Sequence, residues 1–160
     1  TPSMKFHIVG GTEDEISILK SKTKAPNIVW HGFLDQKKAI EILKRDIDIA
    51  LLPNQINVLV GKTNKVDIGK WTSPMKLFEY MSMGKAIVAS DIPVLKEILA
   101  NGVNSLLVSP NEVEEWVSAI LELDDNRVKM DRIKERAYDD LKNKYSWKIR
   151  SQKVLEDLKI

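Results

Sequence analysis

The sequence contains no cysteine and only two histidines, His7 and His31. The lack of cysteine excludes disulfide bonds, thiolate catalysis and cysteine-based metal sites. It is compatible with the cytoplasm, which is where we expect the protein to be. Two histidines are too few for a typical histidine-based metal centre, so we expect no metal site.

Long apolar runs and an excess of one charge are also missing. No run reaches the roughly 18 residues of a membrane-spanning helix, and no signal peptide is visible. The 25 basic and 23 acidic residues are spread along the chain and give a net charge of +2. This balance offers no basic surface for nucleic acid.

The 160 residues, 43% of them hydrophobic, are enough for one domain with a core. Short segments rich in branched apolar residues alternate with segments of helical periodicity, which favours an α/β fold. We therefore expect a Rossmann-like, three-layer α/β/α domain with a parallel sheet. The predicted strands are residues 5–9, 27–30, 47–52, 86–89 and 105–108.

Several candidate binding segments follow predicted strands: Gly10-Gly11, His31-Gly32, residues 54–72 and the helix from Ser73. Ligands of open α/β sheets bind outside the carboxyl ends of the strands, so these segments should converge on one site. Each has an ordinary alternative. Most strand-to-helix glycines serve backbone geometry, and a histidine at a strand edge usually has no ligand.

Residues 54–72 form an unusually long connection without helical periodicity. Such connections are commonly functional loops or disordered. We interpret this one as a mobile flap, with Asn57–Val60 as a short strand or hairpin within it. Its glycines and lysines can equally belong to a solvated surface loop. They are Gly61, Lys62, Lys65, Gly69 and Lys70.

Residues 73–90 combine a capped helix, a glycine stop and a short buried strand. Ser73 is a suitable N-cap, Pro74 suits the first helical position, and Gly84 can end the helix in the left-handed conformation. Apolar residues point around most of the circumference, so the helix should be largely buried.

Lys76 and Glu79 are three residues apart and share one face of this helix. A lysine in the first turn opposes the helix dipole unless an anion lies there, and Glu79 is suited to accept hydrogen bonds from sugar hydroxyls. The pair therefore fits a ligand with phosphate at one end and a sugar at the other. The alternative is an ordinary surface ion pair.

The motif Ser73-Pro-x-Lys-x-Phe-Glu-Tyr-Met-x-x-Gly-Lys-x-Ile-Val-Ala-Ser90 resembles the donor-binding segment of the glycosyl transferases group 1 family. The resemblance continues through residues 91–98, 101–108 and 145–147. It implies a retaining, nucleotide-sugar-dependent enzyme of the GT-B fold, with this chain as its C-terminal donor domain.

By this resemblance, Glu79 binds the ribose hydroxyls, the helix start at Ser73 and Lys76 faces the diphosphate, and the loop at His31 borders the base. The family usually has a first glutamate eight positions before the second, and Trp71 stands there in this sequence. The role of that first glutamate therefore has no counterpart. The implied donor-binding residues are Gly10, Gly11, His31, Gly32, Phe33, Ser73, Pro74, Met75, Lys76, Leu77 and Glu79.

The resemblance also implies that residues 1–160 form one nucleotide-sugar-binding domain, with a crossover helix at about 146–160. The family's first strand–helix unit, which carries an arginine and a lysine for the diphosphate, has no match in the chain. Neither does the N-terminal acceptor domain, the expected partner of this one. We expect any association with the inner face of the membrane to be peripheral and to occur through that N-terminal domain.

The expected reaction is transfer of a sugar from a nucleotide-diphosphate donor to an acceptor such as a glycolipid or polysaccharide. No cofactor other than the donor substrate is expected, and the isolated chain should be inactive. One alternative is a non-catalytic nucleotide-sugar-binding module, for which Trp71 is the best hint. Another is a sugar-nucleotide epimerase of the same architecture.

Overall fold

The computed structural model describes residues 4–60, 66–67, 69 and 75–158. The chain forms two compact units, residues 1–47 and residues 48–160, here called the first and second unit. Ser73, Pro74 and Trp71 lie outside the described residues, as do Gly61, Lys62, Lys65 and Lys70. The predictions for these residues stay predictions.

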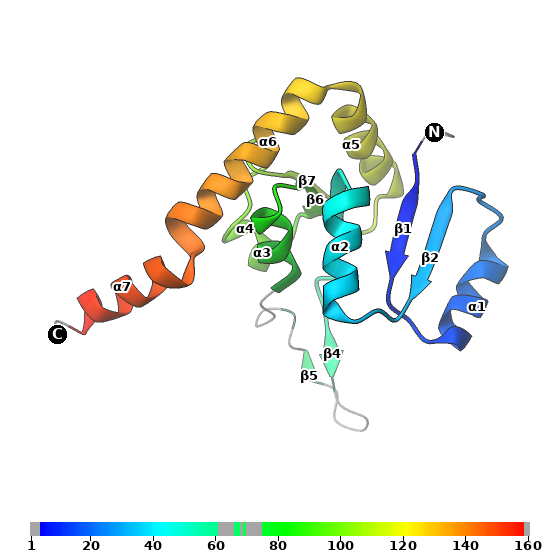
Figure 1. Ribbon diagram of the computed structural model, residues 1–160, viewed down its shortest axis with the longest axis horizontal. Coiled ribbons are helices and arrows are strands. Elements are labelled where there is room, and N and C mark those ends of the chain that lie inside the picture. The colour runs from blue at the N-terminus through cyan, green and yellow to red at the C-terminus, as the bar shows by residue number, and fades with distance from the viewer. Residues whose placement is uncertain (1–3, 61–65, 68, 70–74, 159–160) are drawn as a thin grey trace. The chain divides into compact units, whose positions relative to one another are not determined.

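The first unit contains two parallel strands and two helices (Figure 1). Strand β1 (Phe6–Val9) pairs with β2 (Ile28–Gly32), α1 spans Glu13–Lys22, and α2 spans Gln36–Asp46. Thr12 caps α1 through a reciprocal capping box with Glu15, and the side chain of Asp35 caps α2. These side chains satisfy backbone N–H groups that the first turn leaves free.

The second unit has a parallel sheet in the order β3-β6-β7. Its strands are β3 (Ile49–Leu52), β6 (Ala86–Ser90) and β7 (Leu106–Val108), and every residue of the central β6 is buried. The helices are α3 (Met75–Ser82), α4 (Pro93–Lys96), α5 (Val113–Asp125), α6 (Arg127–Asp140), the π-helical segment η2 (Leu141–Tyr145) and α7 (Trp147–Asp157).

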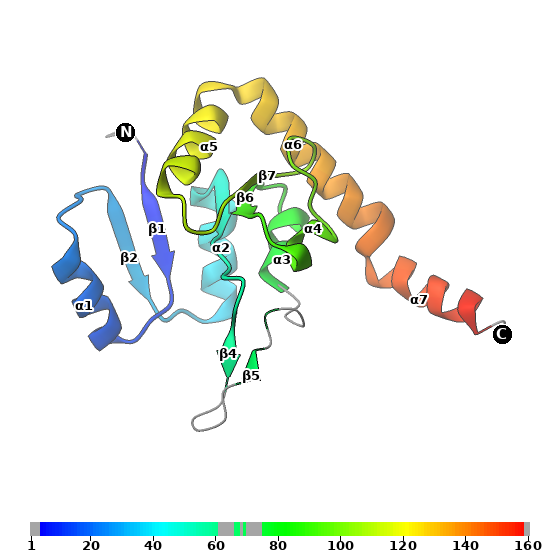
Figure 2. The ribbon, with the colours of Figure 1, turned by 180° about the vertical axis from the view of Figure 1, so that it is seen from behind.

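Alternate residues of β6 feed two hydrophobic clusters, one on each face of the sheet. Ile87 and Ala89 pack in a cluster with residues of α3 and α4, whereas Ala86 and Val88 pack in a cluster with residues of α5 and α6. Figure 2 shows these helices from behind. The three-layer α/β/α arrangement predicted from the alternating pattern is therefore confirmed in this unit.

A short antiparallel hairpin interrupts residues 54–72. It consists of β4 (Leu59–Val60) and β5 (Val66–Asp67), so the short strand predicted within Asn57–Val60 is confirmed, and its partner strand lies beyond that range. Asp67 Oδ1 accepts hydrogen bonds from the backbone N–H groups of Val58 and Gly69, both at 2.9 Å. A side chain at Gly69 would run into the carbonyl group of Ile56, so only glycine fits there.

Two expectations about burial and pairing need correction. Met75, which the apolar pattern placed among the buried residues of α3, is 74% exposed. The strands expected in one parallel sheet are paired in two, one in each unit.

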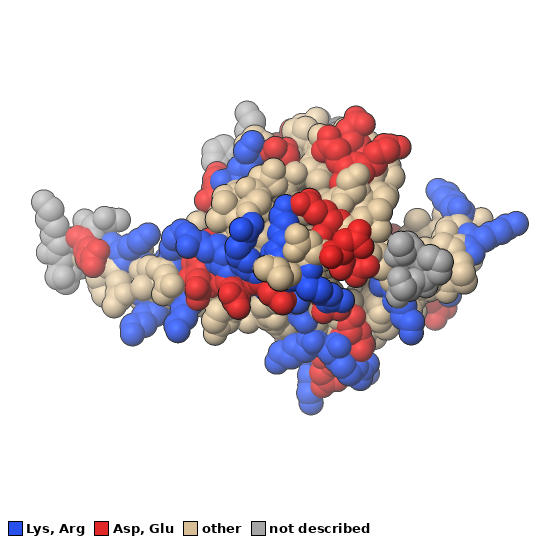
Figure 3. Space-filling model, turned by 90° about the horizontal axis from the view of Figure 1, so that it is seen from above, with Lys and Arg blue, Asp and Glu red and all other residues tan. Residues whose placement is uncertain are grey.

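Figure 3 shows basic and acidic side chains interspersed on one face, in keeping with the balanced composition. Within the described ranges, none of the helices has both the length and the apolar character needed to cross a membrane.

Candidate binding site

Helix α3 is fixed on its inner face and at its end. Leu77 and Met81 are fully buried in the core. Gly84 adopts the left-handed conformation with φ of 59°, and its N–H donates to the carbonyl of Met81 at 3.1 Å. The N–H of Lys85 reaches the carbonyl of Tyr80 at 3.1 Å, which completes a Schellman motif. The glycine stop predicted at position 84 is confirmed.

The outer face of α3 carries Lys76 and Glu79. Lys76 is exposed and Glu79 is half-buried. The ion pairs and hydrogen bonds of the described residues include none to either side chain, and none joins the two. The alternative of an ordinary Lys76–Glu79 ion pair is therefore not what the structure shows. Among the residues that the structure describes, the half-buried Glu79 carboxylate thus has no hydrogen-bond or ion-pair partner.

Two other candidates on α3 differ sharply in exposure. The side chain of Met75 is open to solvent, whereas Leu77 has no exposed surface. A ligand at the start of α3 can therefore touch the side chain of Met75. It can reach Leu77 only through the backbone.

In the first unit, the structure brings the two predicted loops together at the carboxyl ends of β1 and β2. The N–H of Gly10 donates to the carbonyl of Gly32 at 2.7 Å. Gly10, Gly11 and Gly32 have φ of 114°, 85° and 67°, which other residues adopt only with strain. Phe33 follows them and is 85% exposed, as a side chain that packs on a ligand ring can be.

The start of α1 is a poor place for a phosphate group. Its first turn carries Glu13, Asp14 and Glu15. The Glu15 carboxylate accepts the N–H of Thr12 at 2.8 Å, and this backbone hydrogen bond lowers the pKa of Glu15. These negative charges already occupy the positive end of the helix dipole. Gly10 and Gly11 are thus better suited to a neutral part of a ligand than to its phosphates.

The structure adds one residue that sequence reasoning missed. His7, on β1, lies with its Nδ1 atom 3.0 Å from Nε2 of His31 on β2. Both side chains are half-buried. His31 therefore has a protein partner, and whether it also contacts a ligand stays a prediction. The two units are described separately, so convergence of the loops at Gly10 and His31 with α3 stays a prediction.

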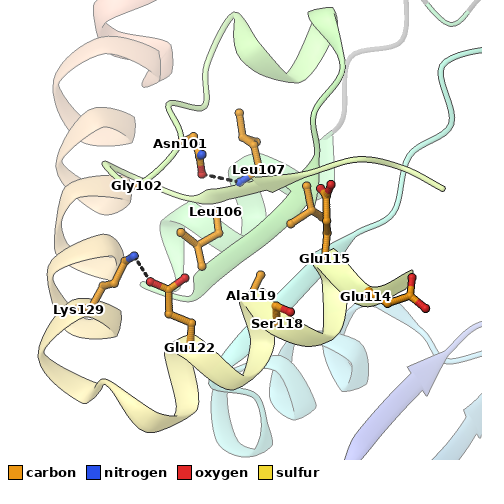
Figure 4. A pocket seen from close by; sticks show the side chains of 11 residues that line it. Asn101, Gly102, Leu106, Leu107, Glu114, Glu115, Ser118, Ala119, Glu122 and Lys129 are labelled. Atoms are coloured by element: carbon orange, nitrogen blue, oxygen red, sulfur yellow. Dashed lines mark hydrogen bonds and ion pairs between the residues drawn. The ribbon is translucent and has the colours of Figure 1, made fainter. Parts of the chain in front are cut away.

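A pocket of about 420 Å³ lies in the second unit between β7 and α5 (Figure 4). Its polar groups are largely engaged with one another or with their neighbours. Glu115 accepts from the backbone N–H of Ser109 at 2.7 Å, Glu122 pairs with Lys129, and the side chain of Asn101 accepts the N–H of Leu107 at 2.9 Å. None of the predicted site residues lines it.

No group of three or more histidine, aspartate or glutamate side chains is placed to enclose a metal ion in the part of the chain that the structure describes.

Comparisons with known proteins point to one family. The family model described as glycosyl transferases group 1 matches residues 1–126. No curated protein sequence matches the chain.

Three solved structures illustrate the shared fold. Anabaena HepE in complex with UDP-glucose has a TM-score of 0.74 at 19% identity, and the match covers 99% of this chain and 42% of that one. A mutant of S. aureus TarM in a complex that includes UDP has a TM-score of 0.73 at 20% identity, with coverages of 95% and 28%.

The third is a glycosyltransferase from Rickettsia africae, with a TM-score of 0.68 at 20% identity and coverages of 96% and 39%. The chain thus spans less than half of the length of each of these three proteins.

Proposed function

The chain belongs to the glycosyl transferases group 1 family, of the GT-B superfamily, and we propose that it is the donor-binding part of a glycosyltransferase that uses a nucleotide-diphosphate sugar. Two of the structural neighbours carry UDP or UDP-glucose, which makes a uridine nucleotide the first ligand to test. The family match favours this activity over a sugar-nucleotide epimerase.

The observation that carries the proposal is the position of Glu79. Its carboxylate is half-buried and has no hydrogen-bond or ion-pair partner among the described residues. The buried side chains of Leu77 and Met81 hold the helix that presents it. A carboxylate presented from a fixed helix can accept hydrogen bonds from both hydroxyls of a ribose.

The diphosphate would lie at the start of α3. The N–H groups of the first turn of a helix and the ammonium group of Lys76 both favour an anion there. As the sugar leaves the donor, charge develops on the diphosphate, and fixed positive groups stabilise that charge in the transition state. Retention of configuration and an acceptor such as a glycolipid or polysaccharide are part of the proposal through the family resemblance.

We further propose that a preceding strand–helix unit and an acceptor-binding domain complete the enzyme. Among the described residues, β1 pairs only with β2, and β3 pairs only with β6, so each has an edge that a further strand can use. The missing unit would also supply cationic side chains to the diphosphate. We therefore expect no sugar transfer by residues 1–160 alone.

A calorimetric titration of the chain with UDP, UDP-glucose, GDP and ADP tests the proposal, with Glu79→Gln beside the unchanged chain. A hydrogen bond to a charged group contributes about 1.5–3 kcal/mol, so Glu79→Gln should weaken binding by roughly tenfold to a hundredfold. Glu135→Gln is the matched control, because it removes the same charge from an exposed position on α6. It should leave the affinity unchanged.

Binding that Glu79→Gln does not weaken would contradict the role of Glu79. If no nucleotide binds at millimolar concentration, the same titration with the full-length protein decides whether the preceding unit is required. Assays of donor hydrolysis and sugar transfer in that protein then separate an active transferase from a binding module without activity.

A further inference from the structure

Tyr145, at the end of the π-helical segment η2, packs against the flank of α3. The centroid of its ring lies 6.0 Å from that of Phe78, and the two ring planes are tilted by 52°. This spacing and tilt are typical of a stabilising aromatic pair. Both side chains are half-buried and pack against the hydrophobic cluster of α3, α4 and β6. Phe78 directly precedes Glu79, so this contact joins η2 to the helix that carries the proposed ribose-binding carboxylate.

The π-helical turn brings Tyr145 to this position. In an α-helix of about 3.6 residues per turn, positions four apart drift by about 40° around the axis. Ala137, Leu141 and Tyr145 follow one another at this spacing, and all three pack in or against the same cluster. The wider turn of η2 counteracts the drift and keeps Tyr145 on the side of the cluster. Its hydroxyl group also donates a long hydrogen bond of 3.5 Å to the carbonyl of Glu97 at the end of α4.

The contacts of α3 with the core leave one motion of this short helix weakly restrained, a roll about its own axis. Leu77 and Met81 define the inner face, and Glu79 lies on the opposite side of the helix. A helix with its side chains is about 10–12 Å across, so a roll of about 15° displaces a carboxylate on the outer face by about 1.5 Å. Phe78 lies on the flank between the two faces, where the contact with Tyr145 opposes such a roll.

We propose that Tyr145 is a positioning residue of the nucleotide-sugar site, because it holds α3 through Phe78 and thereby fixes the place of the Glu79 carboxylate. This inference rests on the function proposed for Glu79. A hydrogen bond weakens steeply as its distance and angle depart from the optimum, so a displacement of about 1.5 Å removes most of its strength. The affinity for a nucleotide therefore depends on Tyr145 as long as Glu79 is present.

A double-mutant cycle, measured by calorimetric titration with UDP, tests this dependence. Tyr145→Leu removes the ring but keeps an apolar side chain at the cluster. It should weaken UDP binding by about threefold to tenfold, which is part of the loss expected for Glu79→Gln. In the Glu79→Gln background, the same substitution should change the affinity by less than about twofold, since the hydrogen bonds that it misplaces are already weakened.

Two further variants separate positioning from a general effect on the fold. Tyr145→Phe keeps the ring and should retain the affinity for UDP within about twofold. Tyr138→Leu is the matched control, because it makes the same change at an exposed position of α6 and should leave the affinity unchanged. Circular dichroism verifies that each variant is folded. The proposal is overturned if Tyr145→Leu binds UDP as tightly as the unchanged protein, or if it weakens binding equally with and without Glu79.

Amide hydrogen exchange tests the contact between Tyr145 and α3 without any ligand. Tyr145→Leu should raise the exchange rates of the α3 amides by about threefold or more, because local opening becomes easier. The amides of the buried strand β6 should change no more than they do in Tyr138→Leu. An equal rise in α3 and β6 would show a general loss of stability and would overturn the positioning role. If α3 alone loosens but the full-length protein binds neither UDP, GDP nor ADP, the proposed function is refuted while the hold of Tyr145 on α3 is confirmed.

Discussion

Replacing Asn104 by alanine should remove a large part of the stability of the chain. Asn104 lies between α4 and β7 and is 2% exposed. Its Oδ1 atom accepts the N–H of Ala100 at 2.7 Å, and its Nδ2 group donates to the carbonyl of Ile98 at 3.1 Å. The same Nδ2 group donates to Oδ2 of Asp140 at 2.9 Å. One side chain therefore ties the turn before β7 to the end of α6.

The expected loss follows from the groups that the substitution leaves without a partner. A buried polar group that loses its hydrogen bond costs about 1–3 kcal/mol. Asp140 retains its ion pairs with Lys144 at 2.7 Å and with Arg136 at 3.5 Å, so the cost of its lost hydrogen bond is at the low end of that range. With the groups at Ala100 and Ile98, the total is about 3–5 kcal/mol, against about 5–15 kcal/mol for a whole domain.

Urea unfolding at neutral pH, followed by circular dichroism, measures this loss. The control is Asn143→Ala, which removes the same side chain from an exposed position in η2 and should change the free energy of unfolding by less than about 0.5 kcal/mol. An Asn104→Ala chain within about 1 kcal/mol of the unchanged chain, with the same dependence on urea, would refute the reasoning. Water would then be able to replace the amide.

Two further predictions concern the same unit. Burial raises the pKa of Asp140, but hydrogen bonds from Lys144 and Asn104 and the charge of Arg136 outweigh it and lower the pKa overall. The stability that the carboxylate contributes is present above its unfolded pKa of about 3.9 and is lost as the pH falls through the lower folded value. The urea concentration at the midpoint of unfolding should therefore fall once the pH is below about 4. Asp140→Asn should show a smaller fall than the unchanged chain. Gly84→Ala should cost about 1–2 kcal/mol in urea unfolding, because φ is 59° there and a side chain would meet open space rather than a clash. Asparagine tolerates this conformation better than alanine, so Gly84→Asn should lower the free energy of unfolding by less. Equal losses in the two variants would contradict the explanation by backbone conformation.

Local signals in the sequence were sufficient for much of the second unit. The glycine stop at Gly84 depends on backbone conformation within one turn, and the buried β6 depends on an uninterrupted apolar run. The short strand at Leu59–Val60 followed from branched apolar residues within an otherwise irregular segment. Each of these features is decided by neighbours in the sequence, which is why composition and spacing predicted it.

Features that depend on distant partners were not visible in the sequence. The contact between His7 and His31 requires both the parallel register of β1 and β2 and the bulge at His31. The exposure of Met75 depends on which face of α3 the sheet covers. Apolar residues around most of that helix predicted that it is largely buried, and Leu77, Phe78, Tyr80 and Met81 do pack in or against the core, whereas Met75 does not.

The main distinguishing feature of Glu79 is that it lies on a helix with a fixed position, rather than its charge. A surface ion pair contributes only about 0–1 kcal/mol, so two side chains lose little by staying apart, and the separation from Lys76 alone would mean little. Leu77 and Met81, however, have no exposed surface and fix the helix that carries Glu79. Because the backbone at Glu79 is already fixed, ligand binding has to order only the side chain of this residue. Glu79 has no hydrogen-bond partner among the described residues and lies on a fixed helix, so it is the position at which a single change of charge should reveal a bound ribose.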